Sequence, residues 1–143
     1  MPGLQNRIYI ASKLNLMERE VNSLKTVLEE RGYEFIYDWT ANPVPKPFEQ
    51  HQKQAHAAAE AMAEAVRCCD ILILLCAPNG LGMYIEAGGA MVTGIILKFI
   101  LKQDHKRIFV VGEENDRSVF YYHDSVTRLP SVPALLNHLP SLT

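Results

Sequence analysis

Apolar residues along this chain form short continuous runs that are separated by stretches with apolar side chains at helical spacing. The runs predict buried strands, at 7–12, 33–39, 71–77 and 106–112. The intervening stretches, at 16–31 and 52–69, predict amphipathic helices. Strand and helix therefore alternate, which is typical of a parallel sheet because parallel neighbours need crossover helices.

Local signals set the expected ends of these helices. Asn15, with Glu18 three residues later, forms a capping-box arrangement, and Arg31 and Gly32 supply a basic last turn and a glycine stop. The second helix is rich in alanine. Its stripe of small or apolar residues, expected to pack closely on the sheet, comprises Ala55, Ala59, Met62 and Val66.

The C-terminal third is expected to complete the fold. Residues 119–122 predict a short fifth strand, and 131–139 predict a short capped helix. Residues 40–48 contain three prolines and no periodicity, which favours a loop long enough to act as a flap. We therefore predict a doubly wound, mostly parallel, five-stranded α/β sheet.

Composition narrows the function classes. A chain of 143 residues with 48% hydrophobic content is the size of one domain, so we expect 1–143 to fold as a single unit. A net charge of −2 gives no general attraction to nucleic acid or anionic lipid. The most apolar late stretch, 92–101, is too short to span a bilayer. Neither a nucleic-acid nor a membrane partner is expected.

The cysteines and histidines predict no metal site. Three cysteines, two of them adjacent at Cys68 and Cys69, show no metal-ligand spacing and favour reduced thiols in a cytoplasmic protein. The N-terminus lacks an apolar signal core. None of the five histidines has a partner at metal or triad spacing, and no nucleophile elbow, Walker loop or dinucleotide fingerprint is present. We expect no cofactor.

The most informative stretch runs from the strand at 71–77 through a glycine turn into a helix that carries Glu86. Gly80 and Gly82 allow a tight turn and close approach of a ligand, at the strand ends where α/β sheets bind ligands. The helix N-terminus should favour the ionised carboxylate, which suits a nucleophile or base better than an acid. Glutamate is also common in a first turn simply because it stabilises the helix, so both interpretations stay open.

Other candidate side chains follow the first two strands. Asp38 could bind a sugar hydroxyl and Trp39 could stack on a base, or the pair could be a turn aspartate beside a half-buried ring. Ser12 and Lys13 offer a hydroxyl and a cation for a sugar or phosphate, although an ordinary solvated lysine is the commoner interpretation of such a position. Tyr9 lies on one face of the first strand, where packing is its commoner use.

These residues together resemble the nucleoside 2-deoxyribosyltransferase-like family. The resemblance spans nearly the whole chain and rests on the order and spacing of several short motifs. They are Tyr9-Ile-Ala-Ser12, Tyr37-Asp-Trp-Thr40, Cys69-Asp70, Gly82-x-x-x-Glu86-x-Gly-x-Ala90, and Phe120-Tyr121-Tyr122 followed by Leu129-Pro130.

The resemblance implies a flavodoxin-like three-layer sandwich and a homodimer or higher homo-oligomer. It also implies that Glu86 attacks C1′ of a nucleoside or nucleotide, after which a base or water takes the glycosyl group. Asp38 is the second catalytic candidate. The expected substrate-binding residues are Tyr9, Ser12, Lys13, Trp39, Asn79, Gly80, Gly82 and Met83.

Two positions depart from the family pattern. Relatives of the deoxynucleoside-monophosphate hydrolase type carry an acidic residue where this chain has Met62, and Glu60 and Glu64 project from other faces of the helix. Their phosphate-binding serine is Gly80 here, so a 5′-phosphate requirement is not implied, and Asp38 remains as candidate proton donor. A nucleotide-binding or signalling module without turnover is therefore the alternative. A flavodoxin-like electron carrier is disfavoured because the first turn lacks a hydroxyl-rich phosphate loop.

Overall fold

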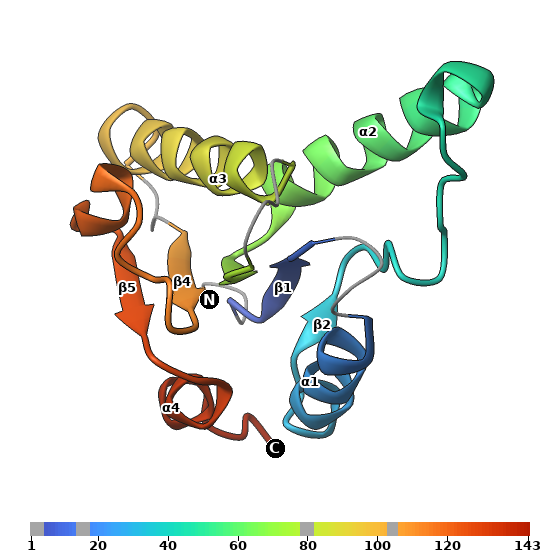
Figure 1. Cartoon of the computed structure of the whole chain (residues 1–143). Coiled ribbons are helices and arrows are strands. Elements are labelled where there is room, and N and C mark those ends of the chain that lie inside the picture. The colour runs from blue at the N-terminus through green and yellow to red at the C-terminus, as the bar shows by residue number, and fades with distance from the viewer. Residues whose placement is uncertain (1–4, 14–17, 78–81, 103–105) are drawn as a thin grey trace.

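The computed structural model describes residues 5–13, 18–77, 82–102 and 106–143. Within them the strands form one five-stranded sheet in the order β2-β1-β3-β4-β5, and every pairing is parallel (Figure 1). The strands are β1 (Arg7–Ala11), β2 (Glu34–Phe35), β3 (Ile71–Leu75), β4 (Arg107–Val111) and β5 (Val126–Leu129). This is the strand order of flavodoxin-like folds, so the expected fold class is confirmed.

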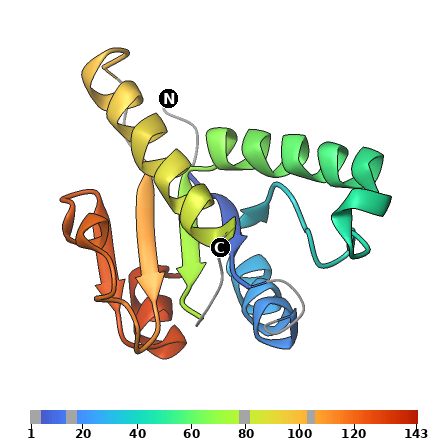
Figure 2. The ribbon, with the colours of Figure 1, turned by 45° about the horizontal axis from the view of Figure 1, so that its top comes forward.

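Helices cover both faces of the sheet and complete a three-layer sandwich (Figures 1 and 2). On one face lie α2 (Gln52–Cys68) and α3 (Gly82–Phe99), and on the other lie α1 (Glu18–Glu30) and α4 (Val132–His138). The central strand β3, Ile-Leu-Ile-Leu-Leu, is buried along its whole length because both of its faces are covered. Its continuous apolar run is the sequence signature of that burial.

The strand register determines which side chains share a face. Tyr9 of β1 is paired with Leu72 of β3, and Leu72 is paired with Ile108 of β4. Residues aligned in this way on parallel strands point to the same side of the sheet. The Tyr9 hydroxyl contacts Glu86 of α3, so all three side chains face the layer formed by α2 and α3.

The end of α1 shows why a glycine follows it. Gly32 has a φ of 93° and its N–H donates to the carbonyl of Glu29, while the N–H of Tyr33 donates to the carbonyl of Leu28. This is a Schellman motif, in which the left-handed residue is usually glycine. The stop predicted at Arg31 and Gly32 is confirmed. The proposed cap, Asn15, lies outside the described residues.

Two strand predictions were wrong in extent or position. The second strand covers Glu34–Phe35 rather than 33–39, and residues 119–122 form a 3-10 helix, η2 (Val119–Tyr122), instead of the fifth strand. Ser118 caps η2 by accepting a hydrogen bond from the Phe120 N–H. The actual edge strand, β5, is largely exposed, so its sequence lacks the alternation that marks a half-buried strand.

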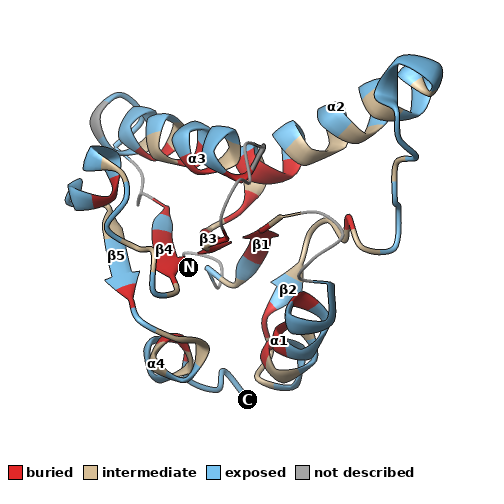
Figure 3. Ribbon diagram, in the orientation of Figure 1, coloured by how far each residue is buried: buried red, intermediate tan, exposed pale blue. Residues whose placement is uncertain are grey.

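The predicted packing of α2 was also wrong for its first half. Ala59 is exposed, whereas Ala65 and Val66 near the end of the helix are buried. The first half projects beyond the sheet (Figure 3), and a 3-10 turn, η1 (Phe48–Gln50), precedes it. The alanine stripe therefore reflects helix propensity as well as packing. The terminal helix α4, capped by the Ser131 side chain on the Ala134 N–H, is as predicted.

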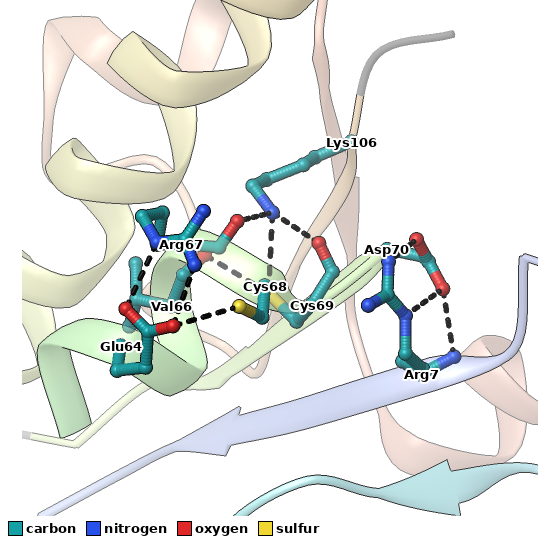
Figure 4. A network of polar contacts seen from close by, with 8 residues as sticks. All are labelled: Arg7, Glu64, Val66, Arg67, Cys68, Cys69, Asp70 and Lys106. Carbon is teal, nitrogen blue, oxygen red and sulfur yellow. Dashed lines mark hydrogen bonds and ion pairs between the residues drawn. The ribbon is translucent and has the colours of Figure 1, made fainter. Parts of the chain in front are cut away.

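Polar contacts lie at the amino ends of the strands, where α2 leads into β3 (Figure 4). Lys106, only 3% exposed, donates from Nζ to the Arg67 carbonyl at 2.7 Å and also to the Cys69 carbonyl. This ammonium satisfies carbonyls at the helix end that have no intrahelical partner. Beside it, the Arg7 guanidinium makes a two-point contact with Asp70, at 3.0 and 2.9 Å.

No helix within the described residues combines the length and the apolar character needed to cross a membrane.

Candidate functional site

A tyrosine of the sheet and a glutamate of the helix above it form the most chemically distinctive contact. The Tyr9 hydroxyl of β1 donates to Glu86 Oε1 of α3 at 2.7 Å. Tyr9 is fully buried, and Glu86 is mostly buried but retains some exposure. Because β1 and β3 are neighbours and α3 follows β3, the fold itself brings the two side chains together.

The protonation state of Glu86 differs from the sequence-based expectation. Burial raises the pKa of Glu86 to about 7, although the hydrogen bond from Tyr9 acts in the opposite direction. We predicted that the helix N-terminus would favour the ionised form, but the structure places Glu86 beyond the first turn of α3, and burial has the largest effect on its pKa. Near neutral pH the group therefore titrates, as a base or nucleophile matched to that pH does.

Tyr9 is held in its neutral form. Burial raises the pKa of its hydroxyl far above the ordinary value, and the nearby Glu86 carboxylate raises it further. Tyr37, which follows β2, also lies close enough to raise this pKa. A neutral phenol is a hydrogen-bond donor, so Tyr9 orients Glu86 rather than competing with it for a proton. Sequence reasoning named Tyr37 only as part of a motif, and its proximity to Tyr9 depends on the β1–β2 pairing.

Ser12 follows β1 at the carboxyl end of the sheet. Its residue is 8% exposed, and its Oγ has no hydrogen-bond partner within the described residues. Buried hydroxyls usually have a hydrogen-bond partner, so this Oγ is available to a ligand or to an ordered water. Lys13 comes next and is partly exposed. Asn79 and Gly80 lie outside the described residues, so the structure does not place them.

Asp38 is engaged in a separate ion pair. Its Oδ2 accepts from Lys25 Nζ at 2.7 Å, and its Oδ1 accepts from the Thr40 N–H and hydroxyl. Burial alone would raise the pKa of Asp38, but the hydrogen bonds from Lys25 and Thr40 bring it below its ordinary value. An ionised carboxylate has no proton to give, so the predicted role of proton donor does not fit this arrangement.

Trp39 is buried, with 4% exposure, and its indole N–H donates to the Ile10 carbonyl at 2.9 Å. Its ring therefore supports the end of β1 and does not offer a face to a base, contrary to the stacking role that we considered. Met83 in the first turn of α3 is also buried, and Gly82 begins that helix. Both have backbone positions beside the turn that leads to Glu86.

The helix position at which the family resemblance implies an acid is apolar here. Met62 is partly buried against the core. Glu60 and Glu64 are exposed and pair within α2, Glu60 with His56 at 3.4 Å and Glu64 with Arg67 at 2.5 Å. The expectation that both glutamates project from other faces of the helix is confirmed.

Two cavities lined by described residues lie away from the Tyr9–Glu86 pair. One lies between α3 and β4, and the other lies between α1 and α4. Residues 78–81, which precede α3, are outside the described residues. Among the described side chains, no group of His, Cys, Asp and Glu is arranged to hold a metal ion.

Comparison with known proteins supports the architecture. No protein-family model and no curated protein matches this sequence. One similar solved structure is the CMP N-glycosidase BcmB of Clostridium botulinum, with a TM-score of 0.60 and 16% sequence identity. The alignment covers 93% of this chain and 97% of that one. At this identity the likeness establishes a shared fold.

Proposed function

We propose that this protein cleaves or transfers the N-glycosidic bond of a nucleoside or nucleotide, with Glu86 as the nucleophile. The observation that carries the proposal is the 2.7 Å hydrogen bond from Tyr9 to Glu86 Oε1 beneath the N-terminal turns of α3. It joins a mostly buried carboxylate to a fully buried neutral donor. Such a pair is expensive to build for packing alone, because both polar groups lose water.

Orientation is the main contribution of Tyr9. One carboxylate oxygen accepts the hydrogen bond from Tyr9, so the carboxylate cannot rotate freely. Its other oxygen is available for attack. In the proposed first step, that oxygen forms a bond to C1′ as the C1′–N bond breaks and the base leaves with the bonding electron pair. Water or a second base then attacks C1′, which releases Glu86 as a carboxylate. The departing base takes its proton from solvent.

Ser12 supports a ligand at the same edge of the sheet. It follows β1 by one residue and has a buried, unpartnered hydroxyl. A sugar hydroxyl or a phosphate oxygen would satisfy it. Lys13 is adjacent and supplies a positive charge, so the two residues match the oxygen-rich part of a nucleoside or nucleotide.

The structural neighbour fits this class of substrate. BcmB is described as a CMP N-glycosidase, which acts on an N-glycosidic bond. Its fold extends over almost all of this chain. This agreement, the resemblance to deoxyribosyltransferase-like proteins and the Tyr9–Glu86 pair support the same reaction class.

A nucleotide-binding module with weak turnover is the second candidate. Met62 replaces the acid of some relatives, and Asp38 is ionised and paired with Lys25. No described carboxylate other than Glu86 is therefore assigned to the reaction. Such a module would bind substrate without releasing base.

Incubation with deoxynucleosides, deoxynucleoside monophosphates and free bases, followed by chromatography, separates the two candidates. We expect base release or exchange by the native protein and its loss in Glu86→Gln, which keeps the size and the Tyr9 contact. Equal release by both proteins would contradict the role of Glu86. Tight binding without release in either protein would favour the module.

The covalent step has its own test. A substrate analogue with fluorine at the 2′ position slows hydrolysis of a glycosyl-enzyme intermediate, so intact-protein mass spectrometry should detect one added glycosyl group. Peptide mapping should locate it on Glu86. Base release without any adduct under these conditions would instead indicate that Glu86 activates water directly.

A homo-oligomer remains part of the proposal. The far half of α3 and the residues that follow it leave apolar side chains exposed, among them Ile95, Ile96 and, just after the helix, Ile100. Contiguous exposed apolar surface of this kind is typical of protein interfaces. A second copy of the chain is the proposed partner, and light scattering should give at least twice the monomer mass.

A further inference from the structure

A large apolar cavity opens on the side of the sheet where α3, β4, β5 and η2 meet. Its volume is about 650 Å³. Aliphatic residues of α3 and the strands form its walls, including Ala87, Gly88, Met91, Ile108, Val110 and Val126. This size and this composition are those of small-molecule pockets.

The cavity is separate from the Tyr9–Glu86 pair. Tyr84, Gly88 and Met91 of α3 line it, and their spacing places them on one face of the helix. Glu86 is two residues from both Tyr84 and Gly88, which is a rotation of about 200° along an α-helix. Its side chain therefore leaves α3 on the opposite side and meets Tyr9.

One end of the cavity is polar. Tyr121 of η2 lines it and is 5% exposed, and its hydroxyl makes no well-aligned hydrogen bond among the described residues. Burial raises the pKa of this hydroxyl above its ordinary value, and the neighbouring Tyr84 phenol raises it further, so the hydroxyl stays protonated and can donate. A ligand acceptor in the cavity would give this donor a better-aligned partner than Tyr84 does.

Two further donors lie at the same cavity. Ser118 accepts the Phe120 N–H through Oγ and keeps its own proton for another partner. Arg117 pairs with Glu114 through one Nη2 contact of 2.9 Å, and a guanidinium has five N–H donors in all. Tyrosine, serine and arginine thus present donors, which together favour an acceptor with negative charge.

Aromatic and small residues shape the space beside these donors. The rings of Tyr84 and Tyr121 stack with centroids 6.4 Å apart and an interplanar angle of 28°. Gly88 faces open space, because a Cβ added there would meet nothing within 4 Å. The space in front of Gly88 is therefore large enough for part of a ligand, and a long side chain at this position would fill it.

We propose that this cavity is a second ligand site, which binds a small aromatic molecule carrying an anionic group such as a carboxylate, sulfonate or phosphate. The aliphatic walls and the tyrosine rings contact the aromatic body. The Tyr121 hydroxyl, Ser118 and Arg117 bind the anionic group. The site is independent of the reaction assigned to Glu86.

The first test compares two fluorescent probes that share one aromatic skeleton. These are 8-anilinonaphthalene-1-sulfonate and its uncharged analogue, N-phenyl-1-naphthylamine. The native protein should bind the sulfonate more tightly. Tyr121→Phe should weaken sulfonate binding by about tenfold, the typical loss for a hydrogen bond to a charged group, and leave the neutral probe unchanged.

A second pair of variants tests the location. Gly88→Ala adds only a Cβ in open space and should bind both probes like the native protein. Gly88→Leu extends into the cavity and should abolish binding of both. Thermal unfolding should show that both variants are folded, and light scattering should give them the native oligomeric mass.

Three results would overturn the proposal. Equal binding of both probes by Gly88→Leu and the native protein would place them on exposed apolar surface elsewhere. Equal affinity for the two probes, unchanged in Tyr121→Phe, would deny the donors a role. Absence of probe binding, together with dissociation of an oligomer by Gly88→Leu, would show that a second copy of the chain fills the cavity.

Discussion

Tyr9 and Glu86 are 77 positions apart in the sequence, and a single 2.7 Å hydrogen bond joins them. The bond connects strand β1 to helix α3, which packs on the same face of the sheet. Burial raises the pKa of this carboxylate, and the hydrogen bond from Tyr9 opposes that rise. Its charge state therefore reports directly on the geometry of the site.

Tyr9→Phe should raise the pKa of Glu86 above its native value of about 7, because the hydrogen bond from Tyr9 lowers that pKa. The expected change is about one pH unit. Carbon-13 NMR of the Glu86 carboxyl group measures it without reference to activity. If Glu86 is the nucleophile, the acidic limb of the rate profile should move in the same direction. A pKa that falls or does not change would contradict the contact.

Glu86→Gln should change how stability depends on pH. The pKa of Glu86 is about 7 in the folded chain against an ordinary 4.5, so folding binds a proton between these values. The stability from protonated Glu86 is fully present below pH 4.5 and is lost as pH rises through 7. Relative to Glu86→Gln, the native protein should therefore lose about 2 kcal/mol between pH 5 and pH 8. Urea unfolding midpoints of both proteins at both pH values measure this difference.

Lys106→Met should destabilise the fold by roughly 2 kcal/mol, because the carbonyls of Arg67 and Cys69 would lose their charged donor inside the protein. Urea unfolding measures the loss. Lys53→Met is the matched control, since Lys53 is an exposed lysine of α2 and should change stability little. Equal effects of the two substitutions would show that the Lys106 contacts add nothing.

Asp38 and Lys25 should act as a structural pair. A double-mutant cycle with Asp38→Asn and Lys25→Met should give a coupling of about 0.5 to 1 kcal/mol, as for partly exposed ion pairs. Base release per folded molecule should stay within about threefold of native in Asp38→Asn, well below the loss expected for a general acid. A loss of a hundredfold or more would return Asp38 to the catalytic assignment.

Met62→Glu should increase base release about tenfold or more, because it supplies a general acid at the helix position where the proposed reaction class would place one. Met62→Leu controls for the altered packing of this partly buried residue. Chromatographic rates for both variants decide the outcome. An unchanged rate in a folded Met62→Glu protein would mean that the missing acid does not limit turnover.

Much of the fold could be inferred from local pattern. The apolar run of β3 predicted a buried central strand, and Gly32 and Ser131 marked a helix end and a helix start correctly. The edge strand β5 was missed because it buries little and so carries no alternation. Residues 119–122 resembled a strand by composition. The Ser118 cap and the exposed side chains of Val119, Phe120 and Tyr122 suit a 3-10 helix instead.

The sequence alone determined the alternation of strands and helices, the parallel sheet and the position of Glu86 in the helix that follows β3. These follow from short-range periodicity and turn chemistry, which act over a few residues. Only the tertiary structure decided the environment of each charge. Burial gave Glu86 a pKa near 7, and Lys25 kept Asp38 ionised. Desolvation and ion pairing depend on side chains that are distant in sequence, so no local pattern encodes them.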